Sequence, residues 1–301
     1  MKNKILLLII LVLSVIAVIS FKNNGTNFNL GKNRVTLNLK DSDTGTISNV
    51  ELENYIIGVV AAEMPASFNE EALKAQAIAS RTYAMYKINN SKGEYDLVTD
   101  VSNQSYITIE EMKDKWNDDF DKYYTKVASA VDETKSLVMK YDDEIISAYY
   151  FAMSNGYTED ASLVFNESKP YLKSIESKWE DESINNFSVT KTFNLSEFCI
   201  LLNVSEENIV ITDVIRSDTN RVNQITINNQ PFSGTEVRKL LGLRSTDFEI
   251  TVTETEVLIT TNGYGHGVGM SQYGANYMAK EGYTYDEILK YYYDGIEIGK
   301  I

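Results

Sequence analysis

Residues 263–275 hold the side chains best suited to chemistry, in the run Gly-Tyr-Gly-His-Gly-Val-Gly-Met-Ser-Gln-Tyr-Gly-Ala. The only histidine of the chain, His266, stands between glycines, and Ser271, Gln272 and Tyr273 follow it. Because glycine has no Cβ, it lets a ligand or another backbone approach closely, and it weakens a strand. We therefore predict a ligand-lining turn that leads into a helix. His266 would be a proton carrier or a sugar contact there, or simply a hydrogen-bonded loop histidine.

The second candidate is the carboxylate of Glu63, at the end of the apolar run Val-Val-Ala-Ala-Glu-Met-Pro at residues 59–65. Burial raises the pKa of a carboxyl group, which suits a general acid. The simpler alternative is a surface carboxylate at a helix end. Arg81 lies in an alanine-rich segment, where we expect it to pair with a carboxylate or to point into a polar cleft.

Composition excludes several function classes. The 301-residue chain has a net charge of −15, which argues against binding nucleic acid and against electrostatic attraction of an anionic polymer. A glycan ligand would have to be held by hydrogen bonds and aromatic stacking. Cys199 is the only cysteine, so an intrachain disulfide and a cysteine-rich zinc site are excluded, and it is most simply a small core residue. The glycine-rich segment also lacks the Gly-Lys-Ser/Thr ending of a phosphate loop.

The apolar pattern predicts the elements that position these groups. Apolar residues recur at helical spacing from residue 52 to residue 60, so a helix should end near Glu63, before Pro65. An alanine-rich helix should follow to about Lys87, with Ser67 as N-cap and Glu70 completing a capping box.

Further elements are predicted along the rest of the chain. Helices are expected at 116–135, 235–241 and 272–280, and a last one begins at a capping box of Thr284 and Glu287. Strands are expected at 35–39, 137–139, 145–152, 209–211, 224–227, 248–252 and 256–260, with a turn at 154–156.

The fold class is predicted to be α+β, with mixed helices and short strands around a substrate cleft, because the elements do not alternate as regular βαβ units. Residues 35–301 form the expected domain, in which 186–260 is a candidate subdomain insertion. No linker separates two domains.

The N-terminus resembles a membrane anchor. Apolar residues run from Ile5 to Phe21, interrupted only by Ser14 and Ser20, and Lys2 and Lys4 precede them. The length is at the short end for a transmembrane helix, and the lysines place the N-terminus in the cytoplasm. A cleaved signal peptide is the alternative, but its small-residue cleavage site is missing. We predict a single transmembrane helix in residues 1–22, a spacer at 23–34 and an extracytoplasmic domain.

Several motifs follow one another along the chain. The first is Tyr55 with residues 59–65 and the run Glu-Ala-Leu-Lys-Ala-Gln-Ala-Ile-Ala-Ser-Arg-Thr-Tyr-Ala at 71–84. The others are Tyr-Phe at 150–151, Ser-Asn-Gly-Tyr-Thr-Glu at 154–159, Pro-Tyr-Leu-Lys-Ser-Ile at 170–175 and the glycine-rich run at 265–275. In this order, the motifs resemble the stage II sporulation protein D family, whose wider superfamily includes amidase-enhancer proteins. The resemblance covers the chain from about residue 33 to its end.

The resemblance implies a peptidoglycan lytic transglycosylase. Such an enzyme cleaves the glycosidic bond between N-acetylmuramic acid and N-acetylglucosamine in peptide-stripped glycan strands, and it leaves 1,6-anhydro ends. Carried over by motif, Glu63 is the catalytic acid/base, and Arg81 and His266 match positions important for activity. The expected substrate-binding residues are Ser154, Gly156, Tyr157, Gly265, Gly267, Gln272 and Tyr273.

No cofactor is expected. Some relatives carry metal-binding Cys and His after the arginine helix, but residues 100–106 here read Asp-Val-Ser-Asn-Gln-Ser-Tyr, so we predict no zinc. Arg81 close to Glu63 would lower the pKa of that carboxyl. We therefore expect Arg81 to bind the sugar or to orient Glu63 through a neighbour.

Two other functions stay open. The chain could be a glycan-binding activator of a partner amidase without chemistry of its own, or a membrane-anchored scaffold. The resemblance also implies an amidase partner that removes stem peptides, a membrane scaffold protein, and a place in the engulfing membrane of a sporulating mother cell.

Overall fold

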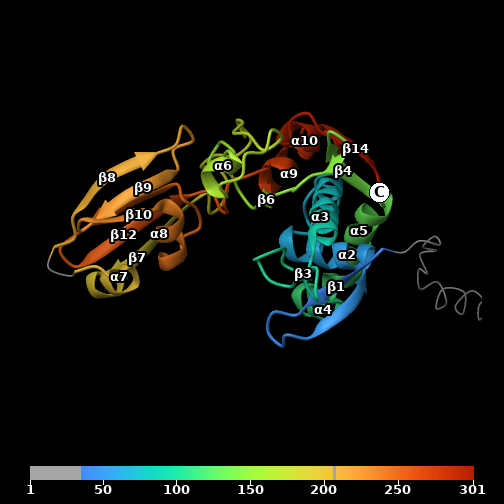
Figure 1. Cartoon of the computed structure of the whole chain (residues 1–301), viewed down its shortest axis with the longest axis horizontal. Helices are drawn as coiled ribbons and strands as arrows, with labels where there is room; N and C mark the ends of the chain where they lie inside the picture. Colours follow the sequence, from blue (N-terminus) through green and yellow to red (C-terminus); the bar gives the residue numbers. More distant parts are fainter. Residues whose placement is uncertain (1–34, 206–207) are drawn as a thin grey trace, which may run out of the picture. The chain divides into compact units, whose positions relative to one another are not determined.

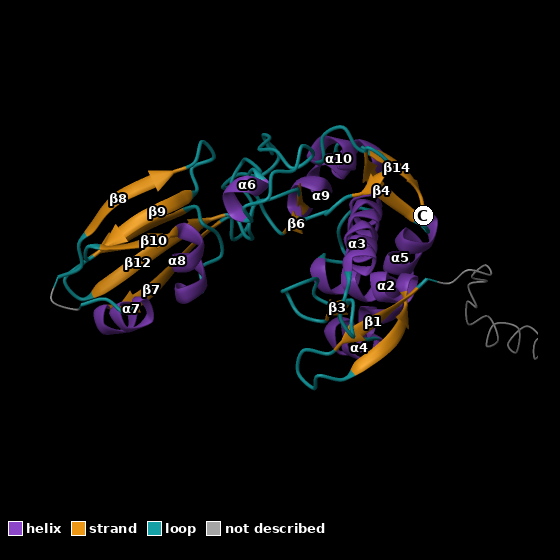
Figure 2. Ribbon diagram, viewed as in Figure 1, coloured by secondary structure: helices purple, strands orange, loops and turns teal. Residues whose placement is uncertain are grey.

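The structure, a computed structural model, describes residues 35–205 and 208–301. These residues form mixed helices and short strands, which confirms the α+β class (Figures 1 and 2). The predicted anchor at 1–22 and spacer at 23–34 lie outside the described residues and stay predictions. No helix among residues 35–205 and 208–301 is long and apolar enough to cross a membrane.

Helix α3 (Glu70–Asn90) is the centre of the helical part and packs against α2, α5, α9, α10 and β4 (Figure 1). Its alanines are buried on several sides, which allows the close packing that their small size predicts. The predicted cap at Ser67 is wrong. Asn69 is the N-cap, because its side chain accepts the Glu71 N–H at 3.0 Å while its own N–H donates to Asn276.

The helices around α3 agree in part with those predicted from the sequence. They are α2 (Leu52–Glu63), α4 (Ile109–Trp116), the short 3-10 turn η1 (Asn117–Asp119), α5 (Phe120–Glu133), α6 (Ala161–Val164), α9 (Gln272–Lys280) and α10 (Tyr285–Tyr292). Helix α2 ends at Glu63 as predicted, and α10 has the predicted capping box. The helix predicted at 116–135 is confirmed only as α5, because Asn117 takes a positive φ of 45° and separates α4 from the turn before α5.

Three small sheets accompany these helices. Strands β1 (Thr36–Lys40), β2 (Ile47–Glu51) and β3 (Leu97–Val98) form one, and β4 (Leu137–Tyr141), β5 (Glu144–Ile145) and β14 (Glu297–Lys300) form another. In the third, β6 (Tyr150–Phe151) pairs in parallel with β13 (Met270–Ser271), which sets the glycine-rich segment beside residues 150–151. The long strand predicted at 145–152 is reduced to β5 and β6.

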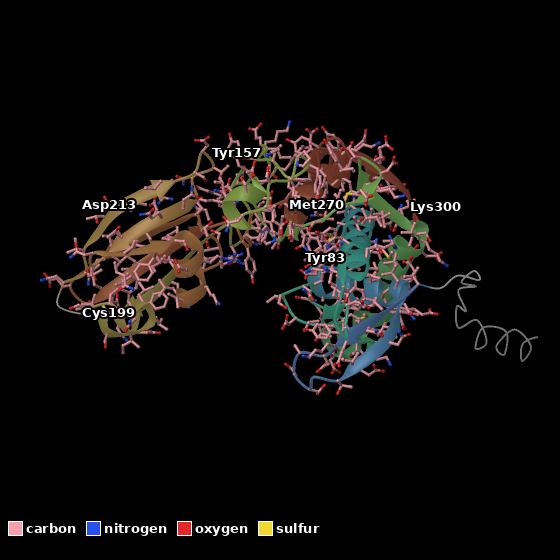
Figure 3. All side chains as sticks on the ribbon, viewed as in Figure 1. Tyr83, Tyr157, Cys199, Asp213, Met270 and Lys300 are labelled. Carbon is pink, nitrogen blue, oxygen red and sulfur yellow. The ribbon has the colours of Figure 1, made fainter. Side chains whose placement is uncertain are left out.

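Residues 188–262 build two further three-stranded sheets with two helices packed on them (Figure 2). The elements are β7 (Ser188–Asn194), α7 (Leu195–Leu202), β8 (Ile211–Arg216), β9 (Val222–Ile227), β10 (Gln230–Ser233), α8 (Gly234–Leu241), β11 (Phe248–Val252) and β12 (Glu256–Asn262). One hydrophobic cluster joins them, and all its buried members lie between residues 193 and 259. Cys199 of α7 is among them, as predicted (Figure 3). That 186–260 is an inserted subdomain stays a prediction.

Candidate functional site

A cleft of about 530 Å³ lies at the C-terminal end of α2 and contains both Glu63 and His266. Its wall is rich in rings, from Tyr83 of α3 (Figure 3) and from residues 149–151 and 264. Its polar groups are Asn103, Gln104, Ser105, Arg238 and Gln272. Amphipathic rings with a few amide and hydroxyl groups suit a sugar chain, which offers both apolar faces and hydroxyls. Glu63 is the only carboxylate among the described residues that line this cleft.

Glu63 has the properties of a general acid. Desolvation by burial is the main cause that raises the pKa of its carboxyl group above the ordinary value. The Ser105 backbone N–H donates to Oε1 at 2.7 Å, and hydrogen bonds from the side chains of Ser105 and Gln272 add to the stabilisation of the charged form. The last turn of α2 also directs the negative end of its dipole at this carboxylate. The carboxyl is therefore held in place, and it binds a proton more tightly than an exposed glutamate does.

A buried chain of hydrogen bonds lies behind the cleft. Gln272 donates to Gln76 at 3.3 Å, and Gln76 donates to Ser80 at 2.9 Å. Tyr150 Oη in turn lies 3.5 Å from Ser80 and donates to Gln104 at 2.8 Å. These contacts connect α3, α9 and the loop after β3, so the wall around Glu63 is set by elements far apart in the sequence.

The glycine-rich segment is shaped by contacts that only glycine allows. Gly265 has φ of +117°, and a Cβ there would lie 2.7 Å from Cβ of Phe151. Gly269 has φ of +78°, and a Cβ would lie 1.9 Å from the Tyr149 carbonyl oxygen. The segment is thus a closely packed turn before α9, as its glycines predict.

His266 is neutral at ordinary pH. Desolvation is the main cause that lowers the pKa of its ring to about 3, and the charges of Arg238 and Arg221 act in the same direction. Nδ1 accepts the Val268 N–H at 3.0 Å, so the neutral ring carries its proton on Nε2. The ring packs among Tyr149, Phe151 and Phe165. An ordinary histidine changes its charge near pH 6.5, whereas burial keeps this ring neutral at that pH.

Arg81 lies outside the Glu63 cleft and is fully buried in α3. It forms a bidentate pair with Glu53 of α2, in which Nη2 lies 2.7 Å from Oε2 and Nε lies 3.1 Å from Oε1. Its remaining N–H groups donate to backbone carbonyls, among them those of Val131 and Leu137. Of the two sequence alternatives, pairing with a carboxylate is confirmed. The guanidinium has no donor left for a sugar.

The other predicted binding residues divide between the cleft and the protein interior. Gly265 and Gln272 line the cleft with Glu63 and His266. Ser154 is buried and donates to Glu180, and Tyr273 packs edge-on against Phe68 at 5.0 Å. Gly156, Tyr157 and Gly267 also lie away from the Glu63 cleft, so the structure brings together only part of the predicted set.

Sequence reasoning missed several residues at the site. Asn103 and Gln104 line the cleft, and the Ser105 N–H bonds Glu63, from a loop that carried no motif. Lys115 donates to the Ala61 and Ala62 carbonyls at 2.8 and 3.3 Å and partly offsets the raised pKa of Glu63. Arg238 carried no signal beyond its charge. In the described parts of the chain, no cluster of three or more His, Cys, Asp or Glu residues could hold a metal ion.

Comparison with known proteins gives the family. A model described as SpoIID, stage II sporulation protein, matches residues 40–141. The stage II sporulation protein D of Bacillus subtilis (strain 168) is 42% identical over 262 residues, which are 85% of this chain and 76% of that protein. That of Bacillus amyloliquefaciens is 37% identical over 286 residues, 93% of this chain and 83% of that protein. The chain belongs to the stage II sporulation protein D family.

A more distant relative broadens the comparison. The amidase enhancer of Bacillus subtilis (strain 168) is 28% identical over 293 residues, which are 79% of this chain and 39% of that protein. Sporulation is therefore the process in which the family places this chain. The resemblance in the sequence motifs is confirmed at the level of family.

Proposed function

We propose that this family member is a peptidoglycan lytic transglycosylase with Glu63 as its only acid/base. The observation that carries the proposal is a single carboxylate with a raised pKa in a ring-lined cleft of about 530 Å³. Ordinary glycoside hydrolysis uses two carboxylates, one of which activates water or forms a covalent intermediate. One carboxylate is enough when the nucleophile belongs to the substrate.

In the first step, protonated Glu63 donates its proton to the glycosidic oxygen between N-acetylmuramic acid and N-acetylglucosamine. The bond from C1 of the muramic residue to this oxygen breaks, and positive charge develops at C1. The N-acetylglucosamine leaves with a free hydroxyl group. Burial of Glu63, which keeps the proton on the carboxyl, favours this step.

In the second step, the ionised Glu63 takes the proton from the C6 hydroxyl of the same muramic residue. The C6 oxygen bonds to C1 and closes the 1,6-anhydro ring. The proton given in the first step is recovered, so the cycle balances without water. The hydrogen bond from Ser105 stabilises the carboxylate between the steps.

Two residues support Glu63 without moving protons. Neutral His266 holds the glycine-rich wall through Val268 and orients hydroxyl or acetamido groups of the glycan. Arg81 acts at a distance, because its pair with Glu53 fixes the start of α2 against α3 and thereby the helix that ends in Glu63.

A second candidate is a glycan-binding activator of a partner amidase, which the likeness to an amidase enhancer favours. In either case, the setting we propose is cell-wall remodelling during spore engulfment. The chain would be a single-pass membrane protein that acts with an amidase and a membrane scaffold protein.

One experiment separates the candidates. The full chain in detergent and its Glu63→Gln variant are incubated with peptide-free glycan strands, and the products are read by mass spectrometry. Anhydro-muramic ends from the wild type alone establish the transglycosylase with Glu63 as its acid/base. Binding by both proteins without any cut product moves the function to the activator.

A further inference from the structure

A second cavity of about 390 Å³ shares two residues with the Glu63 cleft, His266 and Arg238. Arg238 lies in the last turn of α8, and His266 comes from the glycine-rich segment. The second cavity is otherwise lined by Glu159 and Arg221, by small polar groups such as Ser162 and Thr235, and by the apolar side chains of Leu163, Val164 and Val222. Any sugar chain in the Glu63 cleft thus meets a guanidinium at the border of the two cavities.

Arg238 differs from the other buried arginines in having no partner. Across residues 35–205 and 208–301, no group accepts a hydrogen bond from its guanidinium and no carboxylate forms an ion pair with it. Arg81 is saturated by Glu53 and backbone carbonyls. Arg221 donates to Asn155 and the Tyr157 carbonyl and lies 3.9 Å from Glu159 Oε2.

The border therefore carries uncompensated positive charge. Arg221 is neutralised by Glu159, whereas Arg238, which is half-buried, is left with an unpaired charge. Its guanidinium is not among the buried, unpartnered polar atoms of the described residues, so it is open to a ligand, and its fork geometry matches a carboxylate. In a protein of net charge −15, such a group is also the local attraction that an anionic ligand requires.

We propose that Arg238 binds the lactyl carboxylate of the muramic residue in the Glu63 cleft and so selects strands without stem peptides. This inference rests on the proposed function. In a peptide-bearing strand, the lactyl group is an amide and carries no charge. Removal of the peptide leaves a free carboxylate, which can accept two N–H bonds from the arginine. Arg238 is then a specificity-determining residue and takes no part in bond breaking.

The test measures binding to the full chain in the Glu63→Gln background, where nothing is cut. Three tetrasaccharides serve as probes: one with free lactyl carboxylates, the same with lactyl amides, and chitotetraose, which has no lactyl group. In the Glu63→Gln variant with Arg238 intact, we expect the affinity for the free acid to exceed that for the amide by roughly tenfold or more. Such a difference is typical of a charge-assisted hydrogen bond. With Arg238→Ala, the two should bind equally and chitotetraose should be unchanged.

Two further variants sharpen the result. Lys239→Ala removes the same charge from the next residue of α8, whose exposed side chain lines neither cavity, and should keep the tenfold preference. Arg238→Lys keeps the charge but loses the fork geometry of the guanidinium, so this variant should retain part of the preference for the free acid. The preference in the unsubstituted background should also shrink as salt is raised.

A preference for the free acid that survives Arg238→Ala overturns the inference. Equal weakening of all three probes also overturns it, because Arg238 would then only shape the cleft. Tighter binding of a peptide-bearing strand than of the free acid would assign the cavity to a stem-peptide carboxylate instead. If the preference depends on Arg238 but the wild type leaves no anhydro ends, the proposed reaction fails and the recognition stands.

Discussion

The partly buried Glu63 and the buried Glu180 show what separates a reactive carboxyl from a structural one. Desolvation is the main cause that raises the pKa of each. Glu180 accepts two hydrogen bonds on each oxygen, from the Ser154 N–H, Ser154 Oγ, Ser177 Oγ and Ser271 Oγ, at 2.6 to 2.8 Å. Glu63 accepts the Ser105 N–H at 2.7 Å and further hydrogen bonds from the Ser105 and Gln272 side chains, and it lines a cleft that also holds His266.

The comparison teaches that a perturbed pKa alone does not identify a catalytic acid. The four donors around Glu180 leave it no capacity to act on a ligand, and they connect the loop after α6 to Ser154, which follows β6, and to Ser271 of β13. Glu63 keeps open capacity on the side of the cleft. A raised pKa together with open access marks the functional group.

The largest expected effect is a loss of catalytic rate on substitution of Glu63, where substitution of Glu180 should cost stability instead. Glu63→Gln should lower the rate of anhydro-end formation by about 10²–10⁴-fold, because general acid–base catalysis contributes that much. Glu180→Gln should instead destabilise the fold by about 1–3 kcal/mol, since an amide cannot accept all four hydrogen bonds. Turnover per folded molecule and urea unfolding of both variants measure the two effects.

Activity of the folded fraction is the decisive readout. If Glu180→Gln lost activity while its stability stayed at the wild-type level, the structural assignment of Glu180 would be wrong. If Glu63→Gln lost stability as well as activity, its loss of rate would no longer identify an acid.

The next effect concerns the buried pair of Arg81 and Glu53. Arg81→Met should destabilise the protein by about 3–5 kcal/mol, because Glu53, 17% exposed, would be left as a largely buried carboxylate without its partner. The double variant Arg81→Met with Glu53→Met should recover part of that loss. Urea unfolding of the wild type, both single variants and the double variant gives the coupling between the two residues.

Activity per folded molecule tells whether Arg81 acts only through position. A double variant that is stable and retains turnover supports this role. A stable double variant with no turnover would contradict it and would require Arg81 to touch the substrate in another conformation.

The contrast between local patterns and contacts far apart in the sequence explains how much of the fold and of the site could be predicted. Helix α2 was predictable because its periodicity is local and Pro65 follows its end, whereas the apolar neighbours of Glu63 left both a buried and a surface carboxylate open. The partner of Arg81 lies 28 residues away, and Ser271 lies 91 residues from Glu180. No local pattern encodes such pairs, so Ser154 looked like a cleft residue.

Tertiary contacts also explain the smaller differences between the sequence predictions and the structure. Asn69 replaced Ser67 as N-cap where Asn276, from α9, accepts its backbone N–H. Glu63, His266, Gly265 and Gln272 were placed in the cleft by motif and lie there. Arg238 belongs to α8, in the part of the chain with the fewest motifs, and only the folded structure reveals its position.

A smaller effect should appear in the pH dependence of catalysis. The Lys115 cation lowers the pKa of Glu63, so Lys115→Met should raise that pKa further. Because protonated Glu63 starts the reaction, the alkaline limb of the pH–rate profile should move to higher pH. Lys113→Met on the same helix is the matched control, and it should leave the limb in place. A limb that moves to lower pH, or moves equally in the control, would contradict this role.

The smallest expected effect concerns His266 and stability in acid. Its ring has a pKa of about 3 in the folded protein and 6.5 as the ordinary value, so between these pH values the unfolded chain binds a proton that the folded chain refuses. Its contribution therefore makes stability fall as pH falls from about 6.5 towards 3. The amide oxygen of His266→Asn can still accept the Val268 N–H. This variant should reduce the slope of the unfolding free energy against pH by an amount that corresponds to at most one bound proton. Urea unfolding at pH 7, 6, 5 and 4 compares the two slopes, since the carboxylates titrate in both proteins. Parallel slopes would mean that the ring takes up its proton in the folded state, and His266 would again be a candidate proton carrier.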